Sequence, residues 1–457
     1  DIALILGGEY PVNLAMRELL VDVSEFLDYY EVTERFQENA MTHYEYNGGV
    51  YGLPITQNFP MMFYRTDILS ELGYTSPPET WDNLIDMLPE LQRNYMSVGL
   101  VLPSTDIMPS TETGHTFALM MLQRGLNYYN PEKNKSMFDT AGAVNAFEQW
   151  TDFYTEYGCE QSYDVFSRFR TGEYPIVIAD YAFFNQLTEL SPEIKGLWNF
   201  CPVPATENNG KLSHSANSNV SGAVIFRKTE NIDNAWKYIK WFTSTDVQVD
   251  FGSRTEGLFG TMGRLSTANT EALKRLSWSE SELSRLFDQR RELVEIPIIP
   301  SSYLVTRNIM NAFREVVNEK KNPRDTLLWY NRDINDEILR KTSREVETVD
   351  DRIKELLDDM VETMHKYNGV GLAGPQVGVL KRVIVIDLYD GEEPLKLVNP
   401  KIIKTKGEQE VEEGCLSFPN EYAKMIRPKE VVVEALNEEG KKVKIVGKDL
   451  LAQALAH

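Results

Sequence analysis

The sequence is poor in cysteine and has no long apolar run. Its 457 residues include three cysteines, Cys159, Cys201 and Cys415, which are too few for a disulfide-stapled fold. Cys159 and Cys201 form one disulfide if this part is exported, or else they stay as two buried thiols. No apolar stretch approaches the ~20 residues of a membrane-spanning helix, and no basic segment leads into an apolar one at the start. We therefore expect neither a transmembrane segment nor a signal peptide in this sequence.

An excess of positive charge is also missing. Lysine and arginine number 47 against 69 aspartates and glutamates, so the net charge is -22 at pH 7. Such a chain repels phosphate backbones and anionic lipid headgroups, so no nucleic acid is expected as a partner. Hydrophobic residues make up 42% and charged residues 25%, as in ordinary globular proteins. A length of 457 residues exceeds one ordinary core, which predicts two or three domains.

Residues 1–335 are rich in aromatic residues and alternate between strand-like and helical segments. Apolar residues recur at helical spacing in 143–157 and 234–242, and Thr80 is placed to cap a helix that begins at Trp81. Short apolar runs predict buried strands at 1–6 and 174–179. Strands that alternate with helices indicate an α/β architecture.

The character changes after about residue 345, where aromatic residues thin out. Amphipathic spacing predicts a helix over 349–367, and a last helix begins at Asp449. Runs rich in Val and Ile predict strands at 382–387, 431–436 and 443–446, the last two joined by a hairpin loop at 437–440. Strands grouped between two helices indicate a smaller α+β domain.

Three short motifs in this second part carry possible chemistry. Residues 369–376 read GVGLAGPQ, where glycines permit close backbone approach and Gln376 offers an amide donor. Residues 413–417 read EGCLS, in which the Cys415 thiolate can be a metal ligand or a nucleophile, or a packed side chain. Residues 451–457 end in His457, on a helix where a histidine can bind a metal. Taken singly, each motif is more often an ordinary turn, a packed core residue or an uninformative terminus.

Taken together, in this order and spacing, the motifs resemble peptide deformylase, whose pattern is GxGLAxxQ, EGCLS and HExxH. Residues 336–341 and the Arg427-Pro428 pair also fit, so the resemblance covers about residues 336–457. It implies removal of the formyl group from N-formylmethionyl peptides. It also implies a divalent metal, Fe2+ or Zn2+, held by Cys415 and His457. By the same resemblance Gln376 and the Leu416 backbone N–H are catalytic and stabilise the oxyanion, and Gly371 and Leu372 line the substrate cleft.

One departure from this pattern concerns the third motif. The glutamate base and the second histidine of HExxH would follow His457, where the sequence stops. From the sequence we expect a domain truncated within that helix, which releases no formate. His365 is interpreted as a surface or half-buried residue rather than a replacement ligand. The alternative is a non-catalytic solute-binding protein that carries an inactive deformylase remnant.

An ordered set of segments in the first part resembles the family 1 extracellular solute-binding proteins of ABC importers. The segments are 49–55, 61–69, 77–84, 169–178, 192–204 and 234–244. The resemblance implies a two-lobed α/β periplasmic-binding-protein-like fold that closes around a small solute such as a sugar, with an ABC permease as partner. The first lobe is expected to be incomplete. Aromatic faces and amides suit sugar rings and hydroxyls, which makes candidate contacts, or else core residues, of Asn58, Tyr64, Tyr181 and Trp198.

The two resemblances place the boundary between domains 1–335 and 336–457. They also conflict over location, because solute-binding proteins are extracytoplasmic and deformylases are cytoplasmic. Residues 336–338, Asp-Glu-Ile, fit the end of one family and the start of the other. Our hypothesis from the sequence is a chimeric chain joined at this shared stretch and cut at both ends.

Overall fold

The computed structural model divides the chain into two compact units, Asp1–Ile334 and Asn335–His457. Each unit is described by itself below. The structure describes the chain except residues 101–115, 132–134, 209, 300–301, 336–342, 344, 378, 380, 392, 416–417 and 457, and except the side chains of 415–423.

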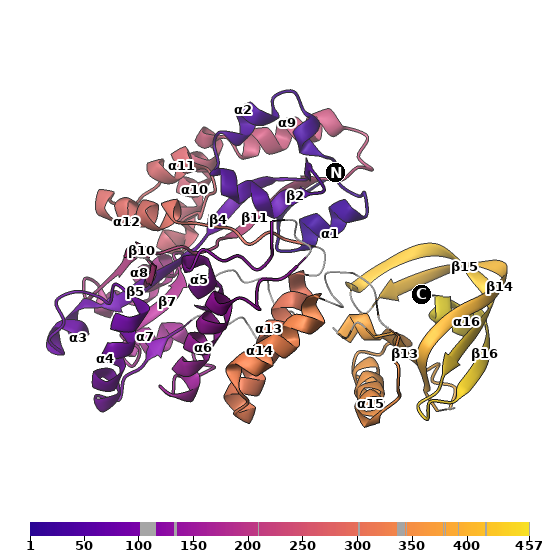
Figure 1. Cartoon of the computed structure of the whole chain (residues 1–457). Helices are drawn as coiled ribbons and strands as arrows, with labels where there is room; N and C mark the ends of the chain where they lie inside the picture. Colours follow the sequence, from indigo (N-terminus) through magenta and orange to yellow (C-terminus); the bar gives the residue numbers. More distant parts are fainter. Residues whose placement is uncertain are drawn as a thin grey trace. The chain divides into compact units, whose positions relative to one another are not determined.

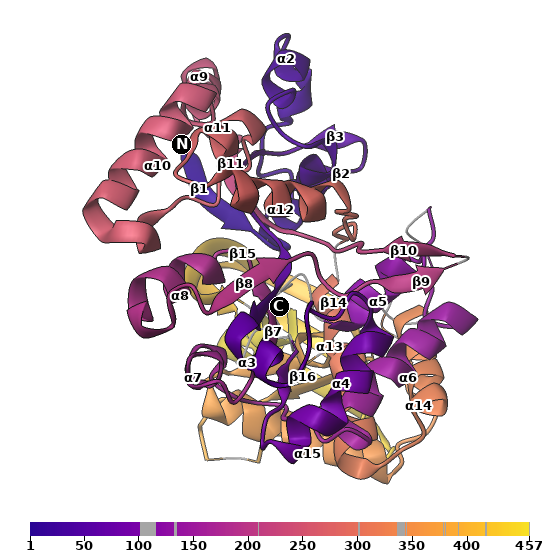
Figure 2. The same cartoon turned by 90° about the vertical axis from the view of Figure 1, so that its left-hand side faces the viewer.

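Two sheets with their own helices make the first unit two-lobed (Figure 2). The first-lobe sheet has the antiparallel order β1 (Ile2–Gly7), β11 (Asn219–Ile225) and β4 (Leu53–Asn58). The second-lobe sheet has the order β6 (Val98–Gly99), β7 (Ile176–Asp180), β5 (Pro60–Arg65) and β8 (Trp198–Cys201). The alternation of strands and helices predicted from the sequence is confirmed, and so is the α/β class.

Helices surround both sheets (Figure 1). The helices of the first lobe are α1 (Tyr10–Met16), α2 (Tyr29–Thr33), α9 (Ile232–Phe242), α10 (Thr245–Phe259) and α11 (Thr270–Arg275). Those of the second lobe are α3 (Thr66–Glu71), α4 (Trp81–Arg93), α5 (Thr116–Gln123), α6 (Ala141–Thr155), α7 (Val165–Thr171), α8 (Phe183–Leu190), α13 (Ser302–Glu319) and α14 (Pro323–Asp333). The predicted cap is present, because the Thr80 hydroxyl accepts a hydrogen bond from the Asn83 amide at 3.1 Å.

Three connections carry the chain between the two lobes. The first is Phe59 alone, since β4 ends at Asn58 and β5 begins at Pro60. The second is 202–218, between β8 and β11, and contains the hairpin β9 (Thr206–Asn208) and β10 (Lys211–Ser213). The third leads from α12 (Glu280–Arg291) to α13, and its described residues are 292–299. Movement of one lobe against the other must be absorbed in these connections.

In the first unit the fold contradicts one expectation and decides between two alternatives. Strand β1 forms, but it is not buried: Leu4 is 38% and Ile5 70% exposed. The reason is that β1 lies at the sheet edge, where its register with β11 is interrupted between Ala3 and Leu6. Cys159 and Cys201 are both free, so of the two alternatives the unpaired thiols hold.

In its described residues the second unit forms a five-stranded antiparallel sheet and two α-helices. The strand order is β12 (Gly371–Ala373), β13 (Val383–Ile386), β14 (Leu395–Cys415), β15 (Phe418–Leu436) and β16 (Lys442–Lys448). The helices are α15 (Asp351–Lys366) and α16 (Asp449–Ala456). This is the α+β domain that the sequence predicted.

The two helices cover opposite faces of that sheet. Val383 and Val385 pack in one apolar cluster with the buried side of α15, whereas Ile384 and Ile386 pack in a second cluster with α16. Successive side chains of a strand point to opposite faces, so α15 and α16 must lie on different sides. Packing of α16 in the second cluster thus sets the position of its end relative to the sheet.

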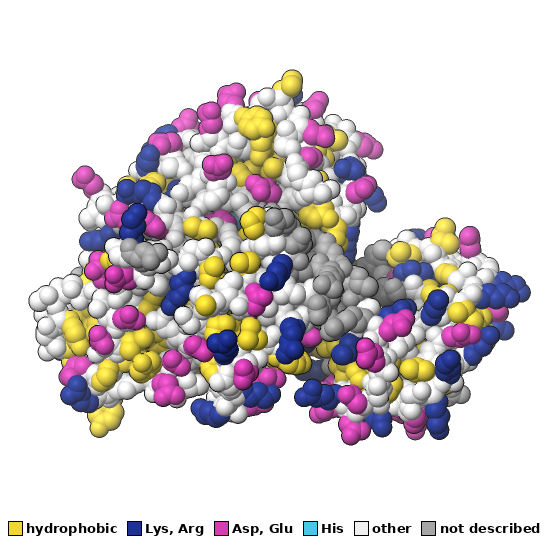
Figure 3. All heavy atoms as spheres, viewed as in Figure 1, with side chains coloured by type: hydrophobic (Ala, Val, Ile, Leu, Met, Phe, Trp, Pro, Cys, Tyr) yellow, Lys and Arg dark blue, Asp and Glu magenta, His cyan; other side chains and the backbone are white. Residues whose placement is uncertain are grey.

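No helix in the described part of the chain is long and apolar enough to cross a bilayer. Acidic and basic side chains are interspersed over the visible face, as Figure 3 shows.

Candidate functional site

The predicted metal ligands stand at two chain segments of the second unit. Cys415 is the last residue of β14, and its backbone pairs with Phe418 of β15. His457 follows α16, which ends at Ala456. The Cys415 side chain, Leu416 and His457 lie outside what the structure describes, so their roles stay predictions.

A buried ion pair joins these two segments. The Arg427 guanidinium of β15 donates from Nε and Nη2 to the two carboxylate oxygens of Glu413, at 2.8 and 2.7 Å. Its Nη1 donates to the Ala456 carbonyl oxygen at 3.1 Å. The Glu413 side chain is only 4% exposed. One guanidinium therefore holds the residue two before Cys415 and the residue one before His457.

The start of α16 is attached to the same hairpin. Gln409 of β14 donates from Nε2 to the Asp449 carbonyl oxygen at 2.9 Å, and to the Pro428 carbonyl oxygen at 3.1 Å. The last carbonyls of a helix have no partner within the helix, and Arg427 supplies a donor to one of them. Both ends of α16 are thus fixed to the β14–β15 hairpin.

The glycine motif forms a tight loop at the sheet edge. Gln376 lies in the 3-10 turn η6 (Gly374–Val377), and its Oε1 accepts from the Ala373 backbone N–H at 2.8 Å. A Cβ at Gly374 would lie 2.7 Å from the Lys381 and Val379 carbonyl oxygens, so only glycine fits there. The loop therefore holds the Gln376 carboxamide in one orientation, with Nε2 as its donor group.

The two predicted cleft residues belong to β12. Gly371 pairs with Ile386, and the Leu372 side chain, 5% exposed, packs against α15. Among the described strands β12 is an outer strand of the sheet order. Its outward backbone N–H and C=O groups form an edge to which an extended peptide can add, apart from the Ala373 N–H, which is bonded to Gln376.

His365 is exposed on α15, as the sequence predicted. Its Nε2 lies 2.7 Å from Asp387 Oδ2. The Tyr389 backbone N–H, and then His365, lower the pKa of the Asp387 carboxyl. Within the residues that the structure describes, no group of three His, Cys, Asp or Glu side chains is arranged to hold a metal ion.

The four candidate solute contacts of the first unit fall into two places. Asn58 and Tyr181 lie beside the first connection, where the Tyr181 amide donates to the Phe59 carbonyl oxygen at 2.9 Å. Trp198 pairs with Arg65 across β5 and β8, whereas Tyr64 pairs with Asn199. Tyr64 and Trp198 therefore point to opposite faces of that sheet. The Trp198 ring packs 5.3 Å from that of Phe184, which matches the core alternative.

Buried polar atoms without a described partner gather near the connections. Such atoms include Asn58 Oδ1, Asn217 Oδ1 and Arg290 Nη1. Arg290 is 1% exposed, and burial lowers its pKa to about 10, so the guanidinium is still charged at neutral pH. A buried polar group needs a partner, which water or a ligand hydroxyl can supply.

Reasoning from the sequence missed the Glu413–Arg427 ion pair. Both residues lay inside recognised motifs, but they are not opposite each other in the β14–β15 register, which pairs Arg427 with Gln409 and Glu413 with Ala423. Sequence spacing gave no signal for this register.

Comparison with known proteins separates the two units in the same way. A family model described as Polypeptide deformylase matches residues 332–457, and one described as Bacterial extracellular solute-binding protein matches residues 1–274. The peptide deformylase of Acetivibrio thermocellus is 59% identical over 126 residues, 28% of this chain and 73% of that protein. Peptide deformylase 2 of Clostridium acetobutylicum is 57% identical over 123 residues, 27% of this chain and 81% of that protein.

Solved structures share the fold of the first unit. An ABC transporter solute-binding protein from Thermotoga lettingae, bound with α-D-tagatose, has a TM-score of 0.60 at 18% identity, over 73% of this chain and 84% of that chain. The sugar-binding protein MalE from Xanthomonas citri has a TM-score of 0.58 at 18% identity, over 75% of this chain and 84% of that chain. The chain thus joins two families: residues 1–274 belong to the bacterial extracellular solute-binding proteins, and residues 332–457 belong to the polypeptide deformylases.

Proposed function

We propose that the second unit is a deformylase domain that binds a divalent metal through Cys415 and His457 and takes N-formylmethionyl peptides. The Arg427 bridge carries this proposal, because it holds the neighbours of both ligands, Glu413 and Ala456, on one guanidinium. Two segments far apart in the sequence are thereby brought to one place.

The donor set suits the expected ion. A thiolate and an imidazole are ligands that Zn2+ and Fe2+ accept. Such an ion supplies Lewis-acid activation of water. The Gln376 amide and the Leu416 backbone N–H donate to the formyl oxygen as negative charge develops on it.

The edge of β12 suits a peptide substrate. An extended peptide that adds beside Gly371 and Leu372 gains main-chain hydrogen bonds without any demand on its sequence. Gln376, three residues beyond β12, then lies next to the terminus of that peptide. A domain that acts on many nascent chains needs recognition of this kind.

Metal uptake tests the proposal without relying on turnover. We expect Co2+ to give the full chain a thiolate-to-metal absorption band, which Cys415→Ala abolishes. Cys159→Ala is the matched control, because Cys159 is a buried free thiol of the other unit and should leave the band unchanged. An undiminished band in Cys415→Ala contradicts the proposed ligand set.

We also propose that the first unit binds a small carbohydrate and delivers it to an ABC permease outside the cytoplasm. Partnerless polar atoms beside the connections favour this, since Asn58 and Asn217 offer amide oxygens and Arg290 a donor. Amides and guanidinium groups bond sugar hydroxyls. Two solved proteins that share this fold, the one from Thermotoga lettingae and MalE3 of T. maritima, are bound with α-D-tagatose and maltose, so these sugars are the first to try.

Thermal stability in a sugar panel tests this second proposal. A sugar at about 100 times its Kd stabilises the binding unit by roughly 2.7 kcal/mol. We expect Asn58→Ala to lose that shift, while the exposed Asn94→Ala keeps it. A panel in which no mono- or disaccharide changes the unfolding temperature contradicts the proposal.

A further inference from the structure

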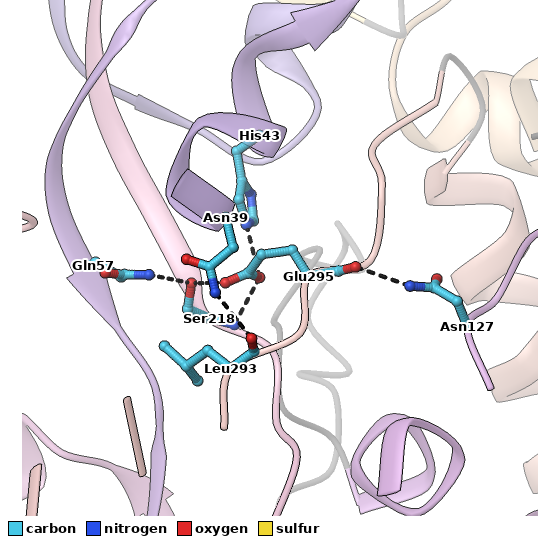
Figure 4. A network of polar contacts seen from close by, with 7 residues as sticks. All are labelled: Asn39, His43, Gln57, Asn127, Ser218, Leu293 and Glu295. Carbon is cyan, nitrogen blue, oxygen red and sulfur yellow. Dashed lines mark hydrogen bonds and ion pairs between the residues drawn. The ribbon is translucent and has the colours of Figure 1, made fainter. Parts of the chain in front are cut away.

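One buried carboxylate lies where the three connections between the lobes meet (Figure 4). Glu295 belongs to the third connection, and Ser218 is the last residue of the second. Gln57 is the residue before Asn58, with which β4 ends at the first connection. Their hydrogen bonds therefore join all three crossing points of the chain.

The chemistry of the donors fixes the direction of the hydrogen bonds from Gln57 to Ser218 and from Ser218 to Glu295. Arg290 Nη2, which can only donate, bonds Gln57 Oε1 at 3.1 Å, so Gln57 Nε2 is the group that donates to Ser218 Oγ, at 3.1 Å. The Ser218 hydroxyl then donates to Glu295 Oε1 at 2.5 Å. The Ser218 backbone N–H donates to Glu295 Oε2 at 2.9 Å.

Both Glu295 oxygens thus accept hydrogen bonds from Ser218. His43 Nε2 lies 3.1 Å from Oε2, within hydrogen-bond distance. The side chains of His43 and Glu295 are 5% and 2% exposed. A buried carboxylate is tolerated only while such donors are kept, and losing one is costly.

Glu295 is attached to both lobes, by different groups. Its side chain bonds His43 of the first lobe, and Asn39 of that lobe donates to the Leu293 carbonyl oxygen at 3.0 Å. The Glu295 carbonyl oxygen accepts from Asn127 of the second lobe at 2.9 Å. Figure 4 shows His43 and Asn127 approaching Glu295 from different elements. The two attachments lie on one residue, so this residue is a pivot.

We propose that the Glu295 carboxylate, with His43, Ser218 and Gln57, is a hinge lock that sets the angle between the two lobes. The proposal rests on the solute-binding function, because the angle decides how far the solute site is open. Rotation of the lobes must change the connections that this carboxylate holds together. Loss of the lock therefore widens the range of lobe angles in the absence of solute.

Lobe angle is measured directly in the full chain. Spin labels at the exposed positions Tyr30→Cys of the first lobe and Tyr95→Cys of the second, with Cys415→Ser, give a distance distribution. We expect Glu295→Gln to broaden or shift this distribution. The new side-chain NH2 group would face a Ser218 group that donates, so one hydrogen bond would be lost. Glu292→Gln is the matched control, three residues earlier and exposed, and should match the parent.

Ser218→Ala gives a milder second variant in case Glu295→Gln does not fold. Amide exchange of 214–218 and 293–299 should rise on the order of ten-fold in it, while β13 of the other unit stays unchanged. Unaltered distances and exchange in the folded variants overturn the hinge lock. A sugar panel run alongside distinguishes the two proposals. Absence of binding in the parent protein refutes the solute-binding function. The spin-label distances measured without sugar test only the hinge lock.

Discussion

At the residue scale, Glu9 is a carboxyl whose burial has a pH signature. It precedes α1, its Oε2 accepts from Asn13 at 3.5 Å, and its buried Oε1 has no partner among the described residues. Burial raises its pKa from 4.5 to about 7. The folded state therefore holds this proton more tightly than the unfolded chain does.

The consequence is a loss of stability as the pH rises. Since the folded pKa is the higher one, the free energy of unfolding falls between pH 4.5 and about 7 and stays low above that. We expect Glu9→Gln to stabilise the first unit by up to about 3 kcal/mol at about pH 8, and by little at about pH 4. Denaturant unfolding at both pH values measures this. An equal effect at the two values would show that Glu9 does not titrate as described.

Arg427 joins three parts of the second unit, because it bonds Glu413 of β14 and Ala456 of α16 from its place in β15. Replacing it with methionine leaves the buried Glu413 carboxylate without its partner, which we expect to cost on the order of 3 kcal/mol. Arg382→Met is the control, because Arg382 also bonds a carboxylate, Glu345, and a carbonyl, that of Pro400, but near the surface. That control should cost less than about 1 kcal/mol. Similar losses in both variants would mean that burial of the Arg427 pair is unimportant.

At the scale of elements, the glycine loop makes a prediction about shape. Gly374→Ala places a methyl group 2.7 Å from two carbonyl oxygens, whereas at Gly371 the nearest atom is 3.7 Å away. We expect Gly374→Ala to destabilise the second unit by roughly 1–3 kcal/mol, and Gly371→Ala by much less. Urea unfolding of both variants compares them. A Gly371 variant as unstable as the Gly374 variant would rule out the steric account.

Periodicity in the sequence was enough for the amphipathic elements. The helices α9 and α15 and the strand β13 form where apolar spacing predicted them. The length of the β14–β15 hairpin could not be predicted, because side chains 401–408 are all exposed and show no alternation. Backbone pairing extends this hairpin beyond the core.

Local motifs likewise predicted only part of the sites. The place of Gln376 in a tight loop followed from its glycines. The pairing of His43 with Glu295 could not be predicted, because the two residues are separated by 252 residues and neither lies in a motif. Contacts made by the fold across such distances leave no local pattern to read.

At the scale of the whole molecule, two units with separate cores share one chain. The family matches fall on either side of the boundary at Ile334, apart from three residues of the deformylase match. Each unit has its own sheet and its own candidate site. Such units should unfold as two cooperative transitions, and each should respond only to its own ligand.

Calorimetry of the full chain tests this account most directly. The enthalpy of unfolding scales with chain length. The unfolding enthalpy of Asp1–Ile334 should therefore be roughly two to three times that of Asn335–His457. We predict that a sugar from the panel, such as D-tagatose or maltose, raises the midpoint temperature of the larger transition only. Zn2+ should raise the midpoint temperature of the smaller transition only. A single transition that both ligands move, or a smaller transition that Zn2+ leaves in place, would contradict the account.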